Sequence, residues 1–466
     1  MESSVPDYLV EAGAGAVEVT ALDKAALAPW LAGQPETVRA WVAATGFKAE
    51  DGAVCLVPAA DGRLGRVLLG LADQDDPWAF AALPGRLPPG DYRIVPEPES
   101  RAATQAALAW SLATYSFERY KKRAAKTWPR LAWPEAADRA QVQRSHDAIT
   151  LVRDLINTPA ADMGPAELAN AAEQMAARFG ARLRVIVGDG LLAENYPAIH
   201  AVGRAAASHR RPRLIDLAWG DEAAPKVTLV GKGVCFDTGG LDLKPSSGMK
   251  LMKKDMGGAA HVLGLASMIM AAGLPIRLRV LIPAVENSVS GDAMRPLDVL
   301  ATRKGLSVEI GNTDAEGRLI LCDALAEASA EAPALLIDMA TLTGAARSAL
   351  GTDLPALFSN DDRLADDILR AGEAEAEPVW RLPLHKPYRR MLDSKVADLT
   401  NASDSPHAGA ITAALFLQEF VAPGVAWAHL DLMAWNGASR PGRPEGGEAL
   451  ALRALFRAIA GRFPPL

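Results

Sequence analysis

Residues 227–240 read VTLVGKGVCFDTGG, and residues 307–318 read SVEIGNTDAEGR. In each stretch a short apolar run, typical of a strand, leads into a glycine-rich loop that carries acidic side chains. Further apolar runs of this kind lie at Leu183–Val187, Arg277–Pro283, Ala334–Met339 and Val425–Leu432. Helices are expected between several of them, at 258–272, 319–332 and 409–420. This alternation predicts an α/β sheet with largely parallel strands and helices on both faces.

The first part of the chain has a different pattern. Short apolar runs at Val54–Val57 and Arg66–Gly70 indicate strands, and Ala103–Arg123 is expected to form one long helix. We therefore predict a small N-terminal α/β domain in residues 1–132 and a linker helix in 133–152. Helices are expected at 146–156 and 165–179, and residues 153–466 should form a larger α/β sandwich around a mixed sheet.

The composition is that of a folded protein without a strong attraction to polyanions. Of 466 residues, 50% are apolar and 23% charged, which excludes disorder as the main state. Lys and Arg number 49 and Asp and Glu 56, so the net charge is 49 − 56 = −7. Two basic segments, RYKKRAAK at 119–126 and residues 209–213, are expected to be solvated surface rather than a nucleic-acid groove.

Cysteine usage and the chain's start favour a cytoplasmic setting. The three cysteines, Cys55, Cys235 and Cys322, form no CxxC motif and are expected to be reduced thiols. The first 15 residues contain Glu2, Asp7 and Glu11 and lack the basic and apolar regions of a secretory signal. The uncharged stretch 256–276 is interpreted as a buried helix of about 15 residues beginning near Gly258, not as a membrane span.

Four acidic residues in loop segments carry the clearest chemical signal, because HExxH, GxSxG and Walker motifs are absent. Asp314 and Glu316 are two residues apart, and in extended backbone such a pair points to one side. Asp237 and Asp255 would add two carboxylates, and two divalent cations would balance the four charges. Such oxygen-rich sets suit Mg, Mn and Zn more than Cu. Taken singly, each aspartate also fits a turn or a cap.

Three of these segments resemble a known family. VGKGVCFDTGG at 230–240, MKKDMGGAA at 252–260 and NTDAEGRL at 312–319 are similar to the leucyl aminopeptidase (cytosol aminopeptidase) family of two-metal exopeptidases. NTDAEGRL is a highly specific match, and residues 338–345, 409–417 and 427–431 also look like the family. The resemblance covers about residues 145–466.

The resemblance implies a role for each matching residue. It makes Asp237, Asp255, Asp314, Glu316 and the amine of Lys232 the ligands of two divalent metal ions, Mn²⁺ or Zn²⁺, with Asp237 and Glu316 bridging them. It makes Lys244 and Arg318 the catalytic side chains, with bicarbonate bound at Arg318 in place of a protein base. It places Met252, Thr341 and Gly344 around the pocket for the N-terminal side chain.

One position departs from the family pattern. Met433-Ala434 stands where the family usually has Ala-Gly, and the bulkier side chain would narrow or reshape the pocket, which leaves the preferred residue open. The resemblance further implies peptide substrates with a free N-terminus and a homohexamer. Two alternatives remain at this stage: a nucleic-acid-binding accessory protein that uses the basic segments, and a peptidase-like scaffold without turnover.

Overall fold

The computed structural model describes residues 8–13, 15–73, 76–121 and 126–464. It divides the chain into two compact units, 1–150 with 438–445 and 151–437 with 446–466. Helix α4 (Arg139–Asn157) crosses the division. The domain limits expected from the sequence stay a prediction.

The first unit is built on a mixed sheet, which is six-stranded within the described residues and runs β1-β6-β5-β2-β4-β3. Only β3 and β4 pair antiparallel in it. Helices α1, α2 and α3 accompany the sheet, and Leu22, Val42, Val57 and Leu68 share one core cluster. The elements are β1 (Leu9–Val10), β2 (Val17–Leu22), α1 (Lys24–Ala32), α2 (Glu36–Thr45), β3 (Val54–Pro58), β4 (Leu64–Gly70), β5 (Asp91–Ile94), α3 (Ser100–Ala113) and β6 (Arg130–Ala132).

The long helix expected at Ala103–Arg123 is wrong in its second half. Helix α3 ends at Ala113, and residues 114–121 are turns and irregular backbone, while residues 122–125 lie outside the described residues. The hydroxyls of Ser111 and Thr114 donate to the carbonyls of Leu108 and Ser111, which competes with continuation of the helix. Aromatic and β-branched residues follow and favour helix only weakly.

A larger mixed sheet forms the centre of the second unit. In the part of the chain that the structure describes it has nine strands, in the order β16-β15-β18-β14-β9-β11-β8-β7, with β10 also paired to β11. The central strands β18, β14, β9, β11 and β10 are parallel, and β8, β7 and β15 pair antiparallel. The strands are β7 (Arg182–Val187), β8 (Arg213–Trp219), β9 (Lys226–Gly231), β10 (Gly233–Asp237), β11 (Arg277–Asn287), β14 (Leu335–Ala340), β15 (Ala356–Ser359), β16 (Trp380–Arg381) and β18 (Trp427–Asp431).

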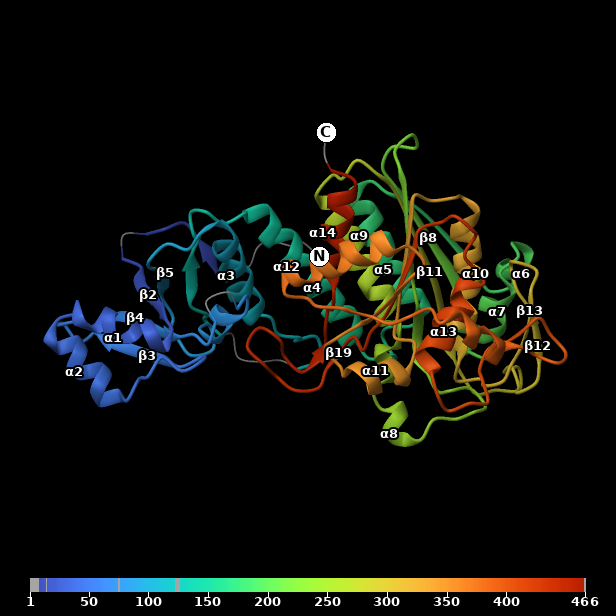
Figure 1. The fold of residues 1–466 in the computed structure, drawn as a ribbon, viewed down its shortest axis with the longest axis horizontal. Helices are drawn as coiled ribbons and strands as arrows, with labels where there is room; N and C mark the ends of the chain where they lie inside the picture. Colours follow the sequence, from blue (N-terminus) through green and yellow to red (C-terminus); the bar gives the residue numbers. More distant parts are fainter. Residues whose placement is uncertain (1–7, 14, 74–75, 122–125, 465–466) are drawn as a thin grey trace. The chain divides into compact units, whose positions relative to one another are not determined.

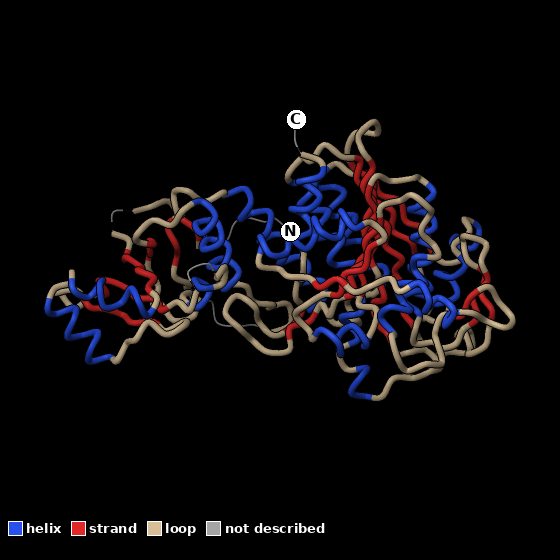
Figure 2. The backbone as a smooth tube through the Cα atoms, in the orientation of Figure 1, coloured by secondary structure: helices blue, strands red, loops and turns tan. Residues whose placement is uncertain are grey.

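Helices cover both faces of this sheet, as the sequence predicts (Figures 1 and 2). Helices α5, α9, α12 and α14 pack in one layer, and α7, α10 and α13 in the other. The helices are α5 (Pro165–Phe179), α6 (Gly190–Ala193), α7 (Pro197–Gly203), α8 (Ser246–Met249), α9 (Gly257–Ala271), α10 (Glu316–Ala330), α11 (Gly344–Leu350), α12 (Asp362–Glu375), α13 (Gly409–Gln418) and α14 (Leu452–Arg462). The fold is thus the expected α/β sandwich around a mixed sheet.

Helix α9 settles the interpretation of the uncharged stretch 256–276. It has 15 residues, and those from Gly257 to Met270 are buried between the sheet and helices α5 and α14. Among residues 8–13, 15–73, 76–121 and 126–464, no helix has both the length and the apolar character needed to cross a bilayer.

Two further small sheets lie in this part of the chain. Strands β12 (Val299–Ala301), β13 (Ser307–Glu309) and β17 (Leu399–Thr400) form one, and β19 (Trp435–Asn436) pairs with β20 (Gly446–Gly447) in the other. The strand expected at Ser307–Ile310 therefore exists, but it belongs to the small sheet and not to the central one. The loop that follows it still reaches the carboxyl edge of the central sheet.

Candidate metal centre

Lys232 and Asp237 come from the irregular step between two strands. Lys232 is the single residue between β9 and β10, and Asp237 is the last residue of β10. A Cβ on Gly231 would lie 2.5 Å from the Val262 side chain, so helix α9 packs directly on this backbone. This close packing explains the glycine before Lys232 and fixes where the lysine side chain starts.

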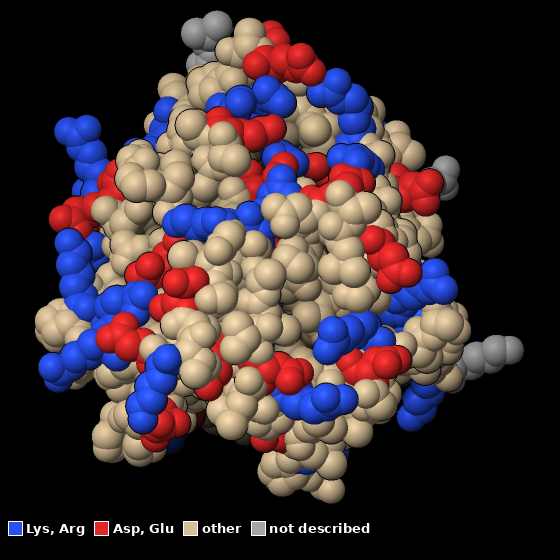
Figure 3. All heavy atoms as spheres, turned by 90° about the vertical axis from the view of Figure 1, so that its right-hand side faces the viewer, with Lys and Arg blue, Asp and Glu red and all other residues tan. Residues whose placement is uncertain are grey.

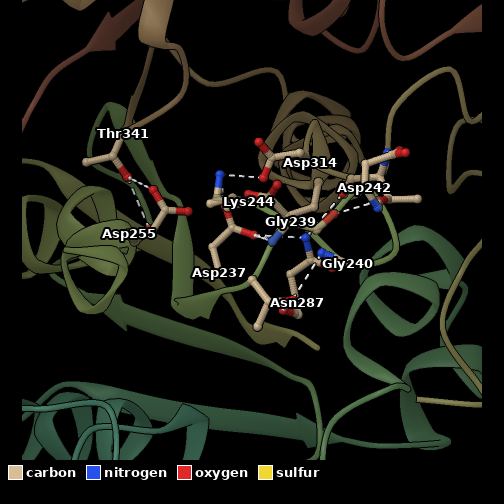
Figure 4. Close-up of polar contacts among 12 residues, drawn as sticks. Asp237, Gly239, Gly240, Asp242, Lys244, Asp255, Asn287, Asp314 and Thr341 are labelled. Carbon is tan, nitrogen blue, oxygen red and sulfur yellow. Dashed lines mark hydrogen bonds and ion pairs between the residues drawn. The ribbon is translucent and has the colours of Figure 1, made fainter. Parts of the chain in front are cut away.

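Asp255 enters the site from a short 3₁₀ segment (Met252–Met256) that leads into helix α9. The hydroxyl of Thr341, just beyond β14, donates to Asp255 Oδ1 at 2.7 Å (Figure 4). Lys232 Nζ lies 2.6 Å from the other oxygen, Oδ2. The Asp255 carboxylate is therefore held in place by residues that follow β14 and β9, without any bound ligand.

Asp314 and Glu316 do not sit in extended backbone, so that part of the sequence argument is wrong. Asp314 lies in a turn in which its N–H donates to the Asn312 side chain at 2.7 Å, and Glu316 is the first residue of helix α10. The helix start turns the Glu316 side chain toward the same centre by another route. The positive end of the helix dipole also favours a carboxylate there.

The structure brings three carboxylates into one cluster and places the fourth beside it. One oxygen each from Asp237, Asp255 and Glu316 lies within 4.8 Å of the others. Asp314 joins through Lys244, whose Nζ ion-pairs with Asp314 and with Asp237 at 2.9 Å (Figure 4). Lys232 Nζ likewise lies 2.9 Å from Glu316 Oε1. Two lysines thus link all four acids.

The electrostatics of this cluster are dominated by burial. Burial, and then the charge of Asp237, raises the pKa of Glu316 to about 8, and the same two causes raise the pKa of Asp314 to about 6. Burial acts against the charge of Lys232, but Asp255, Glu316 and Asp237 outweigh it and raise the lysine's pKa. The surplus of negative charge makes the cluster unfavourable until further positive charge is added.

Buried carboxylate oxygens show which ligands the site fits. Asp255 Oδ2, Asp314 Oδ1 and Glu316 Oε1 are buried against a lysine ammonium, and Glu316 Oε2 is buried without a hydrogen-bond partner. Buried carboxylate oxygens are normally satisfied, and hard divalent cations bind such oxygens. The donor set therefore fits divalent cations.

Arg318 lies in the first turn of helix α10 and is also buried. Its Nη1 donates to the Asn401 carbonyl at 2.6 Å, while Nε has no hydrogen-bond partner. Burial lowers the pKa of the guanidinium to about 10. A buried guanidinium with a free N–H can accept a small anion.

Most of the residues expected from the sequence line one cavity of about 370 Å³. Glu316 and Arg318 are not among the lining residues, but Glu316 forms an ion pair with Lys232, which is. Within the described residues, the cavity lining contains no histidine. The predicted residues in the wall are Lys232, Asp237, Lys244, Met252, Asp255, Asp314, Thr341 and Gly344.

Several residues that were not predicted from the sequence hold the loops of the site in place. Asn287 Nδ2 donates to Asp237 Oδ1 at 2.9 Å, because the two residues are paired across β10 and β11. Thr313 and Asp242 exchange hydrogen bonds that tie the loop after β10 to the loop before α10 (Figure 4). Asp431 accepts the N–H groups of Leu342 and Thr343. Only the position of Asp431 at a strand end could have pointed to it.

The cavity wall also contains cations that the sequence argument passed over. Lys254 follows Lys253 in the 3₁₀ segment, and Arg347 lies in helix α11. Burial lowers the pKa of Lys254. The basic cluster 209–213 is different, since Arg210 donates to Glu286 at 2.6 Å and to the Ala160 carbonyl, and so is engaged in internal contacts.

Comparison with known proteins agrees along both parts of the chain. A model of the cytosol aminopeptidase family, catalytic domain, matches residues 150–456, and a model of the "M17 aminopeptidase, N-terminal domain" matches residues 17–134. A probable cytosol aminopeptidase of Roseiflexus castenholzii is 40% identical over 380 residues, which span 78% of this chain and 77% of the relative.

Solved structures give the same result. The cytosol aminopeptidase of Coxiella burnetii superposes with a TM-score of 0.95 at 51% identity, over 98% of this chain and 99% of its own. The bottromycin maturation enzyme BotP in complex with Mn superposes with a TM-score of 0.85 at 36% identity, over 96% and 100%.

Proposed function

The chain belongs to the cytosol aminopeptidase family, and from this premise we propose that its cavity releases the N-terminal residue of peptides with two bridged divalent cations. Family membership makes it a metal-dependent exopeptidase of the leucyl aminopeptidase type. The observation that supports the proposed site best is the excess of acids over cations: four carboxylates share the ammonium groups of Lys232 and Lys244, and Glu316 Oε2 is buried without a hydrogen-bond partner.

We assign the ligands to the residues of this cluster. Asp237 and Glu316 would bridge two cations, Mn²⁺ or Zn²⁺, and Asp255, Asp314 and the amine of Lys232 would complete the set. When bound, such a pair supplies Lewis acid chemistry for the scissile carbonyl and its attacking water, and a binding site for the free α-amine. The complex of BotP with Mn supports a divalent cation as the ligand of this cluster.

Lys244 and Arg318 are proposed to act on the substrate and on a small anion. The Lys244 ammonium lies in the cavity wall, where it can donate a hydrogen bond to the oxygen that gains charge as the peptide carbonyl is attacked. Arg318 has a buried, unpaired Nε–H that would hold bicarbonate as a proton carrier. The absence of a histidine from the described cavity wall supports a non-protein base.

The substrate's first side chain would lie against Met252, Thr341 and Gly344. These residues belong to the same cavity wall and come from the 3₁₀ segment, the loop after β14 and the start of helix α11. Asp431 holds that loop through the Leu342 and Thr343 N–H groups, so the pocket wall is built on the edge of the sheet.

Hydrolysis of aminoacyl-anilides tests the proposal. The protein should cleave Leu-p-nitroanilide, lose this activity after chelation and regain it with Mn²⁺ or Zn²⁺. Acetyl-Leu-p-nitroanilide should not be cut, because acetylation removes the amine that would bind a cation. Equal rates for the two anilides, or full activity without metal, would contradict the assignment.

Assembly and location form a further part of the proposal. We propose a cytoplasmic homohexamer, which sedimentation velocity would test through the mass of the particle. Three buried, free cysteines support a reducing compartment. The described residues on the face in Figure 3 mix both charge signs, which argues against a nucleic-acid groove there; duplex DNA binding in moderate salt would reopen that alternative.

A further inference from the structure

Two cations in the cavity wall have no role in the proposed metal centre. Lys254 precedes Asp255 and is only 5% exposed, and Arg347 lies in the exposed face of helix α11. In the described part of the chain, neither has a carboxylate oxygen within 4.0 Å. A buried ammonium without a close counter-ion is unfavourable, so its presence in a cavity wall calls for a ligand.

Both cations lie at the pocket proposed for the substrate's first side chain. Arg347 Nη1 is 3.9 Å from the sulfur of Met433, and a Cβ built on Gly344 would lie 3.8 Å from Arg347 Nη2. Burial is the main cause that lowers the pKa of Lys254; Asp255 acts in the opposite direction, and Lys232 and Arg347 add to the lowering. The residue that departs from the family pattern, Met433, therefore packs beside a guanidinium.

The nearest acids are already engaged. Asp431 accepts hydrogen bonds from two backbone N–H groups and from the Thr343 hydroxyl at 2.6 Å. Asp255 is bound by Lys232 and by Thr341. The pocket is thus left with positive charge that its own residues do not neutralise at close range.

We propose that this pocket selects an acidic N-terminal residue, glutamate or aspartate, an inference that rests on the proposed function. The side-chain carboxylate would lie between Lys254 and Arg347, and the planar guanidinium can donate two parallel hydrogen bonds to it. The thioether of Met433 offers a soft apolar wall for the methylene groups of glutamate. A neutral aliphatic side chain would leave both cations without a partner.

Glutamate and glutamine provide the matched substrates, because they have the same shape and differ in charge. For the metal-loaded protein we expect kcat/KM for Glu-p-nitroanilide to exceed that for Gln-p-nitroanilide by about tenfold or more, the range of a charge-assisted hydrogen bond. A ratio near or below one in the wild type would overturn the inference.

Two variants locate the effect. Arg347→Gln and Lys254→Met should each lower the Glu/Gln ratio severalfold, and the double variant should bring it close to one. Arg363→Gln, an exposed arginine of helix α12 outside the cavity wall, is the control and should keep the wild-type ratio. An unchanged ratio in both cavity variants would also contradict the inference.

Calorimetry separates this inference from the proposed function. Free L-glutamate and L-glutamine are titrated into the metal-loaded protein and into the two cavity variants, so that no turnover is needed. If no anilide were cut, the proposed function would fail, and stronger binding of glutamate that depends on Arg347 or Lys254 would still support the pocket's preference. Equal binding of the two amino acids would overturn it.

Discussion

Glu316 and Asp323 lie on the same helix, α10, seven residues apart, and both are buried carboxylates whose pKa is raised first of all by burial. Asp323 accepts the N–H groups of Ala198, Ile199 and Arg303 at 2.8–3.2 Å. Glu316 has no such backbone donors: its Oε1 lies 2.9 Å from the Lys232 ammonium, and its Oε2 has no hydrogen-bond partner. The fold thus supplies hydrogen-bond donors to the buried carboxylate of Asp323 but no backbone donors to that of Glu316. A ligand is therefore expected at the start of α10, where Glu316 lies.

Removal of Glu316 should produce the largest effect. Glu316→Ala removes a proposed bridging ligand, and we expect kcat/KM for an aminoacyl-anilide to fall at least about a hundredfold, since even residues behind metal ligands cost 10–100-fold. Metal content, measured on the same sample, should fall as well. The free energy of unfolding should not decrease much, because Glu316 is repelled by Asp237. Full activity with unchanged metal content would refute the assignment.

Removal of Asp323 should lower the stability of the fold and leave the activity nearly unchanged. Asp323→Ala leaves three backbone N–H groups without an acceptor, and at about 1–3 kcal/mol for each buried unsatisfied group we expect a loss of roughly 4 kcal/mol. Urea denaturation measures this loss. The kcat/KM of the protein that remains folded should stay within about twofold of wild type, because Asp323 binds N–H groups at the start of α7 and just after β12 and is not among the residues that line the cavity. A large loss of activity without a loss of stability would contradict the structural role.

A third buried group, His261, is hydrogen-bonded like Asp323 and should make the stability of the fold depend on pH. His261 in helix α9 is held by the Gly257 carbonyl and by the Leu450 N–H, and burial lowers its pKa to about 4. Between pH 6.5 and 4 the unfolded chain binds this proton and the folded chain does not, so stability falls as the pH falls. The loss reaches about 3 kcal/mol near pH 4 and is absent above about pH 7.

The variant His261→Gln isolates this contribution from other acid-sensitive groups. Its free energy of unfolding, followed by urea denaturation from pH 7 to pH 4.5, should fall less steeply than that of the wild type. Parallel pH profiles of the two proteins would show that His261 is not the source.

The same contrast explains what the sequence could predict. The α/β sandwich follows from alternating apolar runs, and helices such as α5 (Pro165–Phe179) have the expected limits, because periodicity and caps are local signals. The acidic residues of the site were found because they stand in glycine-rich loops after strands. Their geometry was not: Asp314 sits in an Asn312-supported turn and Glu316 begins a helix, although both were expected in extended backbone.

Contacts over long sequence separations were out of reach for the same reason. Asn287 lies beside Asp237 only through the register of β10 and β11, and Thr341 reaches Asp255 only because the loop after β14 ends there. Lys254 was visible in the sequence, but nothing local shows that it lines a cavity together with Arg347.

The smallest predicted effect concerns Thr341. This residue belongs to the fold but satisfies one oxygen of a proposed metal ligand. Its hydroxyl donates to Asp255 Oδ1 at 2.7 Å, while Oδ2 faces Lys232. Thr341→Val keeps the shape and removes this hydrogen bond, so Asp255 is less firmly oriented. We expect metal affinity to fall about tenfold, the lower end of the range for a residue that supports a metal ligand, with little loss of stability.

Thr412→Val is the control. The buried Thr412 hydroxyl donates at 3.2 Å to a carbonyl of its own helix, α13, and Thr412 is not among the residues that line the cavity. Titration of Mn²⁺ by calorimetry compares the two variants with the wild type. If Thr341→Val bound the metal as tightly as Thr412→Val does, the Thr341 hydroxyl would not orient Asp255 for metal binding, and its role would be limited to the loop after β14.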